Sequence, residues 1–142
     1  MRTKLAIVIA AVSLLASAAP VWAHHAFAAE FDGTKEIKLQ GTVTKMEWIN
    51  PHAWIHVDVK NPDGSVTPWM VEAAAPNALL RRGWTKEDLL PGVVINVQGY
   101  QAKDGANRAN GSIITFTNGK KLFVGSSNPN AVEYEQDKGQ KK

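Results

Sequence analysis

Strict alternation of apolar and polar residues restricts the middle of this chain to β structure. In residues 36–44 the odd positions are apolar or glycine and the even positions are polar. Residues 52–60 repeat this pattern, with polar or aromatic side chains at the even positions. Because successive side chains of a strand point to opposite faces, a period of two predicts strands with one buried face. We therefore expect two strands, separated by the break at Asn50–Pro51.

Irregular positions inside these segments predict where the strands bend. The alternation slips at Lys45–Met46, which indicates a β-bulge. Gly41 lies in mid-strand, where a missing side chain permits the tight curl of a small barrel. Residues 66–73 predict a third strand that contains Pro68, and proline in a sheet is confined to edges and bulges. We therefore expect Pro68 at one of those two places.

The order of the elements predicts the topology. The turn at residues 61–64 joins the second and third strands, and residues 76–90 are the helical candidate, with a second start at Thr85. Three further strands are expected at residues 93–101, 108–117 and 121–124. This order predicts a mostly β fold: a small Greek-key barrel of the oligonucleotide/oligosaccharide-binding (OB) type, with five to six antiparallel strands and one helical connection between strands 3 and 4. An open antiparallel sandwich is the alternative.

The first 23 residues have the pattern of a signal peptide. Two cations precede an apolar run, and Val21-Trp22-Ala23 supplies small residues where signal peptidases read them. We expect an exported protein, periplasmic or secreted, without a stable membrane anchor, because the run is too short to span a bilayer comfortably. The remaining chain divides into an N-terminal arm at residues 24–35, the OB-like domain at 36–125 and a flexible polar tail at 126–142. The arm shows no sustained period, but Phe27 and Phe31 could pin it to the domain, so we expect an ordered arm that is neither helix nor strand.

Composition narrows the function classes. Removal of the leader would leave 119 residues, enough for one domain, with 14 Lys and Arg against 13 Asp and Glu. Such a balanced charge makes a nucleic-acid partner improbable. The chain has no cysteine, so disulfides, thiolate metal sites and thiol nucleophiles are excluded. No nucleophile can be paired with a base, and we expect a binding protein and not an enzyme.

Cleavage after Ala23 would create a copper-capable terminus. The new α-amine beside the imidazoles of His24 and His25 forms a nitrogen donor set, and such donors rank Cu(II) at the top of the divalent affinity order. His52, at the entrance of the second strand, is our choice for a third imidazole. His56 lies about 13 Å farther along that strand, too far to share the ion. The alternative is that the two terminal histidines are simply solvated.

A second hypothesis is a metal-free module that binds a small ligand or an exported protein partner. Trp54 shares a strand face with His56, and aromatic side chains on OB-like faces stack on ligands. Arg81 and Arg82 add a cationic pair suited to carboxylates. In the alternative interpretation, Trp54 belongs to a second small core and the arginines only complement the helix dipole.

Several sequence blocks in the same order resemble a known family. These blocks are HHAFAAEFD, GTVTKMEWINPHAWIHVDVK, APNALLRRGW, GYQAKDGANRANG and KKLFVGSSN. Together they resemble DUF6152, a family of exported bacterial proteins of unknown function. The resemblance implies a small, mostly β, secreted or periplasmic domain. It also implies that the paired histidines His24 and His25 and the step from Asn50 to His52 are recurring features, and it supplies no catalytic residues.

Overall fold

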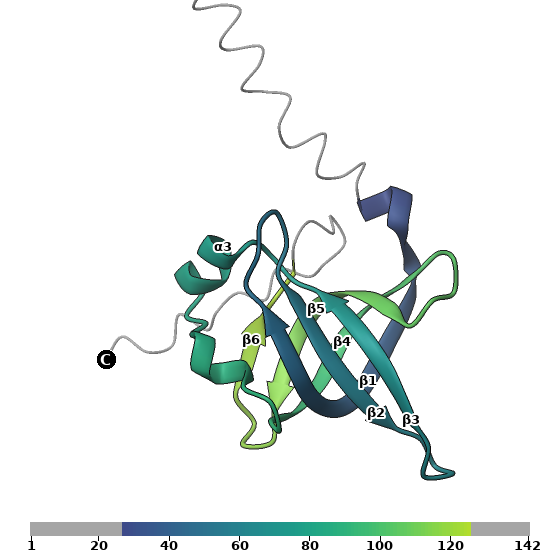
Figure 1. Cartoon of the computed structure of the whole chain (residues 1–142). Helices are drawn as coiled ribbons and strands as arrows, with labels where there is room; N and C mark the ends of the chain where they lie inside the picture. Colours follow the sequence, from purple (N-terminus) through teal and green to yellow (C-terminus); the bar gives the residue numbers. More distant parts are fainter. Residues whose placement is uncertain (1–26, 126–142) are drawn as a thin grey trace, which may run out of the picture.

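The described part of the chain is one six-stranded sheet with a helical connection. A computed structural model describes residues 27–125 (Figure 1). Its elements are β1 (Phe31–Glu47), β2 (Trp54–Lys60), β3 (Val66–Glu72), α3 (Pro76–Arg81), the 3-10 helix η1 (Lys86–Leu89), β4 (Val94–Ala102), β5 (Arg108–Phe116) and β6 (Lys121–Phe123). The mostly β class, the six strands and the helical connection between β3 and β4 are therefore confirmed.

The strands follow the order β3-β2-β1-β4-β5-β6, and each neighbouring pair in this order is antiparallel. In addition, β3 pairs with β5 in parallel through Met70, Val71 and Glu72. The rest of β3, which includes Pro68, has a strand neighbour on the β2 side alone within the described residues. Pro68 therefore lies at an edge, as its missing N–H group requires.

β1 pairs with two neighbouring strands because it bends at its centre. Its second half pairs with β2 and its first half with β4. A Cβ atom at Gly41 would lie 2.5 Å from Val57 Cγ1 and 2.6 Å from the carbonyl oxygen of Asp58, so only glycine permits this approach. The register shifts between Val43 and Lys45, which confirms the irregularity expected from the alternation.

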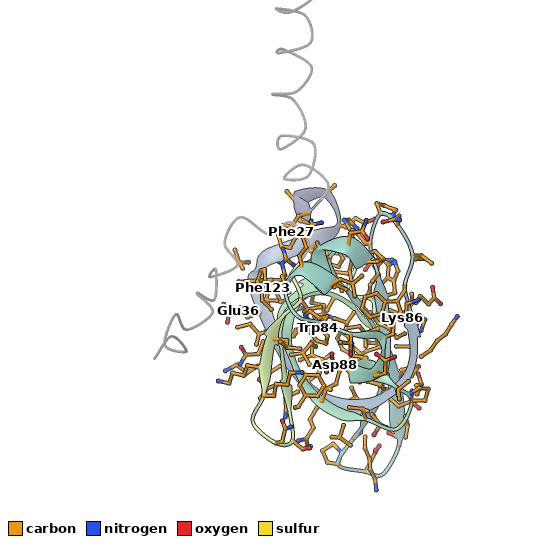
Figure 2. The ribbon with its side chains drawn as sticks, turned by 90° about the vertical axis from the view of Figure 1, so that its left-hand side faces the viewer. Phe27, Glu36, Trp84, Lys86, Asp88 and Phe123 are labelled. Atoms are coloured by element: carbon orange, nitrogen blue, oxygen red, sulfur yellow. The ribbon has the colours of Figure 1, made fainter. Side chains whose placement is uncertain are left out.

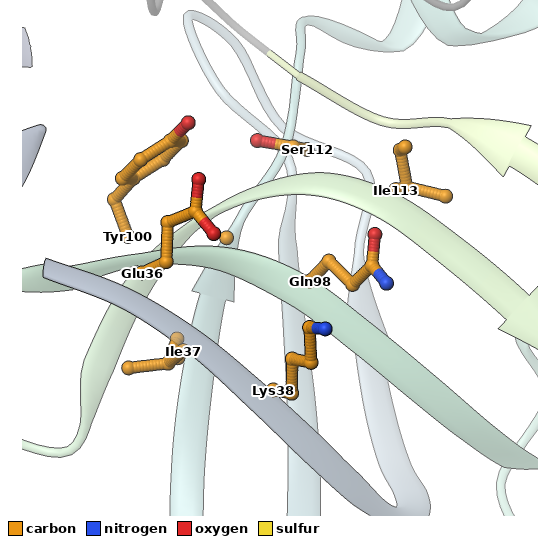
Figure 3. A pocket seen from close by; sticks show the side chains of 8 residues that line it. Glu36, Ile37, Lys38, Gln98, Tyr100, Ser112 and Ile113 are labelled. Carbon is orange, nitrogen blue, oxygen red and sulfur yellow. The ribbon is translucent and has the colours of Figure 1, made fainter. Parts of the chain in front are cut away.

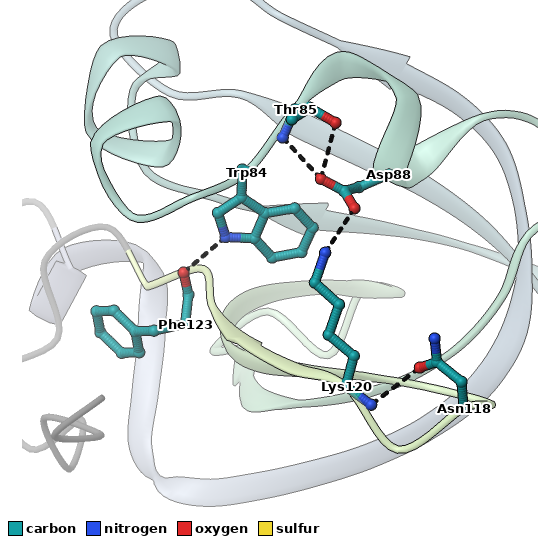
Figure 4. Close-up of polar contacts among 6 residues, drawn as sticks. All are labelled: Trp84, Thr85, Asp88, Asn118, Lys120 and Phe123. Carbon is teal, nitrogen blue, oxygen red and sulfur yellow. Dashed lines mark hydrogen bonds and ion pairs between the residues drawn. The ribbon is translucent and has the colours of Figure 1, made fainter. Parts of the chain in front are cut away.

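The main core lies between the sheet and the helical connection. Its largest fully buried side chain is Trp84, whose Nε1 donates a 2.9 Å hydrogen bond to the carbonyl oxygen of Phe123 (Figures 2 and 4). Beside it, Lys120 reaches Asp88 across 2.9 Å. Asp88 also accepts hydrogen bonds from the backbone and hydroxyl of Thr85, the capping arrangement expected at the second helical start. These contacts fix the connection against the β5–β6 hairpin.

The N-terminal part of the described chain differs from our expectation. Residues 27–30 are helical, and β1 begins at Phe31, whereas we expected neither helix nor strand before residue 36. The physical reason is a second, small core of Phe27, Phe31, Tyr100 and Ala102. The ring of Phe27 meets that of Tyr100 edge to face, with centroids 5.9 Å apart. Burial of these aromatic rings fixes a segment that has no periodic pattern of its own.

Three predictions concern residues outside the described part: the signal peptide at 1–23, the histidines His24 and His25, and the tail at 126–142. They stay predictions, as do the domain boundaries. Among the helices of residues 27–125, none is long and apolar enough to cross a membrane.

Candidate functional site

Polar and aromatic side chains from five strands form one row on the outer face of the sheet. The register places Trp54 of β2 opposite Glu47 of β1 on one side and Glu72 of β3 on the other. Glu72 in turn pairs with Asn110 of β5, and Asn110 with Tyr100 of β4. Because paired residues point to the same face, these side chains all lie on the side away from the main core.

Glu72 and Asn110 form the buried centre of this row. They are 4% and 0% exposed, and Asn110 Nδ2 donates a 2.9 Å hydrogen bond to Glu72 Oε1. The same carboxylate oxygen lies 3.3 Å from Nδ1 of His52, whose side chain is 31% exposed. This is an ion-pair distance; it directs Nδ1 toward the carboxylate and leaves Nε2 as the ring nitrogen that His52 offers to a ligand.

His56 belongs to a different group. Its Nε2 lies 3.1 Å from Glu47 Oε1, and Lys45 Nζ lies 2.5 Å from the same oxygen. The hydrogen bond from Lys45, with smaller contributions from its charge and from His56, holds the pKa of Glu47 below its ordinary value of 4.5. His52 therefore contacts a carboxylate of β3, whereas His56 contacts a carboxylate of β1. These are the two strands on either side of β2.

The structure groups Trp54 with the histidines and places the two arginines elsewhere. Trp54 is half-buried, and its cross-strand partners are Glu47 on one side and Glu72 on the other. Arg81 is exposed in the last turn of α3. Arg82 Nη1 donates a 2.7 Å hydrogen bond to the carbonyl oxygen of Gly125, and its guanidinium lies 4.7 Å above the Phe123 ring. Burial, followed by the charge of Arg81, lowers the pKa of Arg82. Arg82 thus fastens α3 to the chain after β6.

A complete metal site is not formed by residues 27–125 alone. They contain no group of three or more His, Asp or Glu side chains that could hold an ion. His52 with Glu72 provides two members of such a group, and His24 and His25 lie outside the described residues. A metal at His52 therefore needs further donors from outside this part of the chain.

The family match includes every residue of this row. The family of unknown function DUF6152 matches residues 10–111, about 72% of the 142 residues. The chain belongs to DUF6152. No curated protein and no solved structure matches it. The DUF6152 match extends from before the predicted mature terminus to Gly111, so it includes Glu47, His52, Trp54, Glu72 and Asn110.

Sequence reasoning had not assigned two central residues of this DUF6152 site, Glu72 and Asn110. A signal for Glu72 was present in the hairpin. The pairing of Lys60 with Val66 across the turn continues without a shift to Trp54 and Glu72. Counting outward from the turn therefore places a carboxylate beside Trp54. No local signal exists for Asn110, because its contact with Glu72 depends on the parallel pairing of β3 with β5.

Proposed function

We propose that this DUF6152 chain is an exported, OB-like binding domain that holds copper through the mature N-terminal residues His24 and His25 together with His52. The proposed role is therefore binding and not catalysis. It depends on removal of residues 1–23, which creates the α-amine of the donor set.

The strand pairing supports the OB-like barrel. In the order β3-β2-β1-β4-β5, the two end strands are themselves paired, so five strands form a closed series of neighbours. The helical connection lies between β3 and β4, where an OB barrel has its helix. The bend of β1 at Gly41 is the kind of feature that such closure needs.

The observation that carries the copper proposal is the contact of Phe27 with Tyr100. Tyr100 is the cross-strand partner of Asn110, which donates a hydrogen bond to the carboxylate that holds His52. Adjacent strands are about 4.8 Å apart, so Tyr100 and Glu72 are separated by about 10 Å. His25 precedes Phe27 by two residues, which span at most about 7 Å. The arm therefore begins on the same side of the sheet as Glu72 and His52, which is the side that a copper site with His52 requires.

The environment of His52 supports a ligand role. Metal-bound histidines commonly donate their second ring N–H to a carboxylate, which fixes the ring and raises its basicity. Glu72 is positioned to do this, and it is itself held by Asn110. Three nitrogen donors and an amine suit Cu(II), and both amine and imidazole lose their protons to it near neutral pH.

Electron paramagnetic resonance of the processed protein with one equivalent of Cu(II) tests the proposal. Protein that begins at His24, as verified by mass spectrometry, is expected to give a nitrogen-rich spectrum. A glycine inserted before His24 is the matched control and is expected to abolish it. His52→Asn is expected to change the spectrum, whereas His56→Asn is not. Glu72→Gln is expected to weaken copper affinity by about 10–100-fold.

Two results would contradict the proposal. One is an identical spectrum with and without the inserted glycine, and the other is an identical response of His52→Asn and His56→Asn. Circular dichroism of each variant separates a lost ligand from a lost fold.

The second candidate is a metal-free module that binds a small ligand or an exported protein partner through the face around Trp54. The half-buried indole, whose cross-strand partners are Glu47 and Glu72, with Met70 37% exposed on the same face, favours it. In this case protein purified from the periplasm contains no copper, and Trp54→Ala abolishes cross-linking to its partner. Copper in the purified protein together with unchanged cross-linking of Trp54→Ala would exclude this candidate.

A further inference from the structure

A hollow on the surface of β1, β4 and β5 lies beyond the histidine groups. It has a volume of about 190 Å³ and shares with the row described above only Tyr100 (Figure 3). Its polar lining consists of Glu36, Lys38, Gln98, Tyr100 and Ser112. Ile37 and Ile113 are its apolar lining.

The backbone itself shapes this hollow. Gln98 pairs with Ile113 and Gly99 with Gly111, so Ser112 is an extra residue without a partner on β4. Gly99, which lines the hollow, approaches β5 so closely that a Cβ atom would lie 2.2 Å from the carbonyl oxygen of Asn110. The bulge and the close approach of the two backbones thus shape this part of the surface.

Three polar groups of the lining lack partners in residues 27–125. The Oγ atom of Ser112 is buried and makes no hydrogen bond there, an arrangement that costs free energy until a partner is supplied. The ion pairs of this part of the chain include neither Glu36 nor Lys38. The hollow therefore carries one carboxylate and one ammonium group available to a ligand.

These two charges lie at different ends of the hollow. Glu36 and Lys38 are two residues apart on one strand, so they share a face and their Cα atoms are about 6.6 Å apart. In Figure 3 the carboxylate of Glu36 lies toward Tyr100, and the side chain of Lys38 lies beside Gln98. Figure 3 also shows the hydroxyl of Ser112 directed toward the Tyr100 side. One end of the hollow thus offers an anion with two hydroxyls, and the other a cation with an amide.

We propose that this hollow binds a small zwitterion of amino-acid size. Its ammonium group contacts Glu36 and the hydroxyls of Tyr100 and Ser112, and its carboxylate contacts Lys38 and Gln98. The volume of about 190 Å³ lies below the range of about 300–1,000 Å³ that is typical of pockets for drug-sized ligands, which favours a small ligand. A zwitterion matches both charges of the lining, whereas an anion or a cation would contact only one of them. This site uses no metal and is independent of the copper proposal.

Nuclear magnetic resonance titration of the ¹⁵N-labelled, metal-free protein with γ-aminobutyrate tests the proposal. The amide signals of Gly99, Gly111 and Ser112 are expected to shift saturably. Butyrate and butylammonium, which each carry one of the two charges, are expected to bind more weakly by about tenfold or more. Glu36→Gln and Lys38→Gln are expected to weaken γ-aminobutyrate binding by a similar factor. Lys35→Gln, on the same strand but outside the lining, is the matched control and is expected to leave it unchanged.

Several outcomes would overturn the proposal. Absence of a saturable shift at millimolar ligand excludes the site. Equal binding of γ-aminobutyrate, butyrate and butylammonium excludes recognition of both charges. Equal affinity of Glu36→Gln and Lys35→Gln, with unchanged amide spectra outside the hollow, excludes the assigned contact of the ammonium group.

Discussion

Substitution of Gly99 by alanine tests the close approach of β4 and β5, on which both the outer row and the hollow depend. A Cβ atom there would lie 2.2 Å from the carbonyl oxygen of Asn110 and 3.1 Å from Gly111 Cα. Both are backbone atoms, so no side chain can move aside. Reaching even 3.0 Å, a separation below which real Cβ contacts essentially never occur, requires the strands to part by about 0.8 Å.

The size of the effect follows from three contributions. Overpacking costs about 1–3 kcal/mol, and each weakened hydrogen bond of the β4–β5 ladder costs about 1 kcal/mol. The smaller conformational freedom of alanine in the unfolded chain returns about 0.4–1 kcal/mol. We therefore expect Gly99→Ala to lower the free energy of unfolding by about 2–4 kcal/mol. At a urea dependence of about 2 kcal/mol per molar, the midpoint falls by about 1–2 M.

Urea unfolding monitored by tryptophan fluorescence measures this change. Gln98→Ala is the matched control, because Gln98 is the exposed neighbour in the same strand, and its effect is expected to stay within about 0.5 kcal/mol. The parallel pairing of β5 with β3 holds Asn110 beside Glu72. If β5 moved away from β4, this pairing and the hydrogen bond from Asn110 to Glu72 would be weakened as well. The reasoning is refuted if Gly99→Ala and Gln98→Ala unfold at the same urea concentration.

Two further predictions concern the helical connection. Trp84→Phe removes the hydrogen bond to the carbonyl oxygen of Phe123 inside the core. We expect it to lower the free energy of unfolding by about 1–3 kcal/mol, as measured by thermal unfolding. A melting temperature equal to that of the parent chain would contradict this prediction. Burial opposes the charge of Asp88, but hydrogen bonds from Lys120 and Thr85 outweigh it and hold its pKa below 3.8. A lowered folded-state pKa stabilises the fold above the unfolded value and loses this contribution as pH falls through the folded value. The stability gap between the parent chain and Asp88→Asn is therefore expected to be full at pH 7 and to shrink below about pH 4. A gap that stays constant between pH 7 and pH 3 would contradict this assignment.

Much of the fold follows from local patterns. The period of two predicts β2 and the centre of β1, and the turn at residues 61–64 fixes the register of the β2–β3 hairpin. Gly41 predicts the bend because only a residue without a side chain permits the contact with Val57. These features could be predicted because each depends on residues close together in the chain, or on a conformation that few residue types adopt.

The start of β1 could not be predicted in the same way. Residues 27–35 contain two phenylalanines but no period, and their structure depends on Tyr100, which lies far along the sequence. Local propensity carries no information about such a partner. The same reason explains why Asn110 was not assigned to the site.

The sequence by itself determined the bend of β1, the helical connection and the strands other than the start of β1, because backbone sterics and side-chain periodicity act within a few residues. Only the tertiary structure decided which side chains meet. The parallel contact of β3 with β5 brings Asn110 to Glu72, and Glu72 to His52, although 38 residues separate the first two along the chain. Such a buried carboxylate depends on contacts between strands distant in sequence, since its desolvation must be balanced by partners that no local pattern specifies.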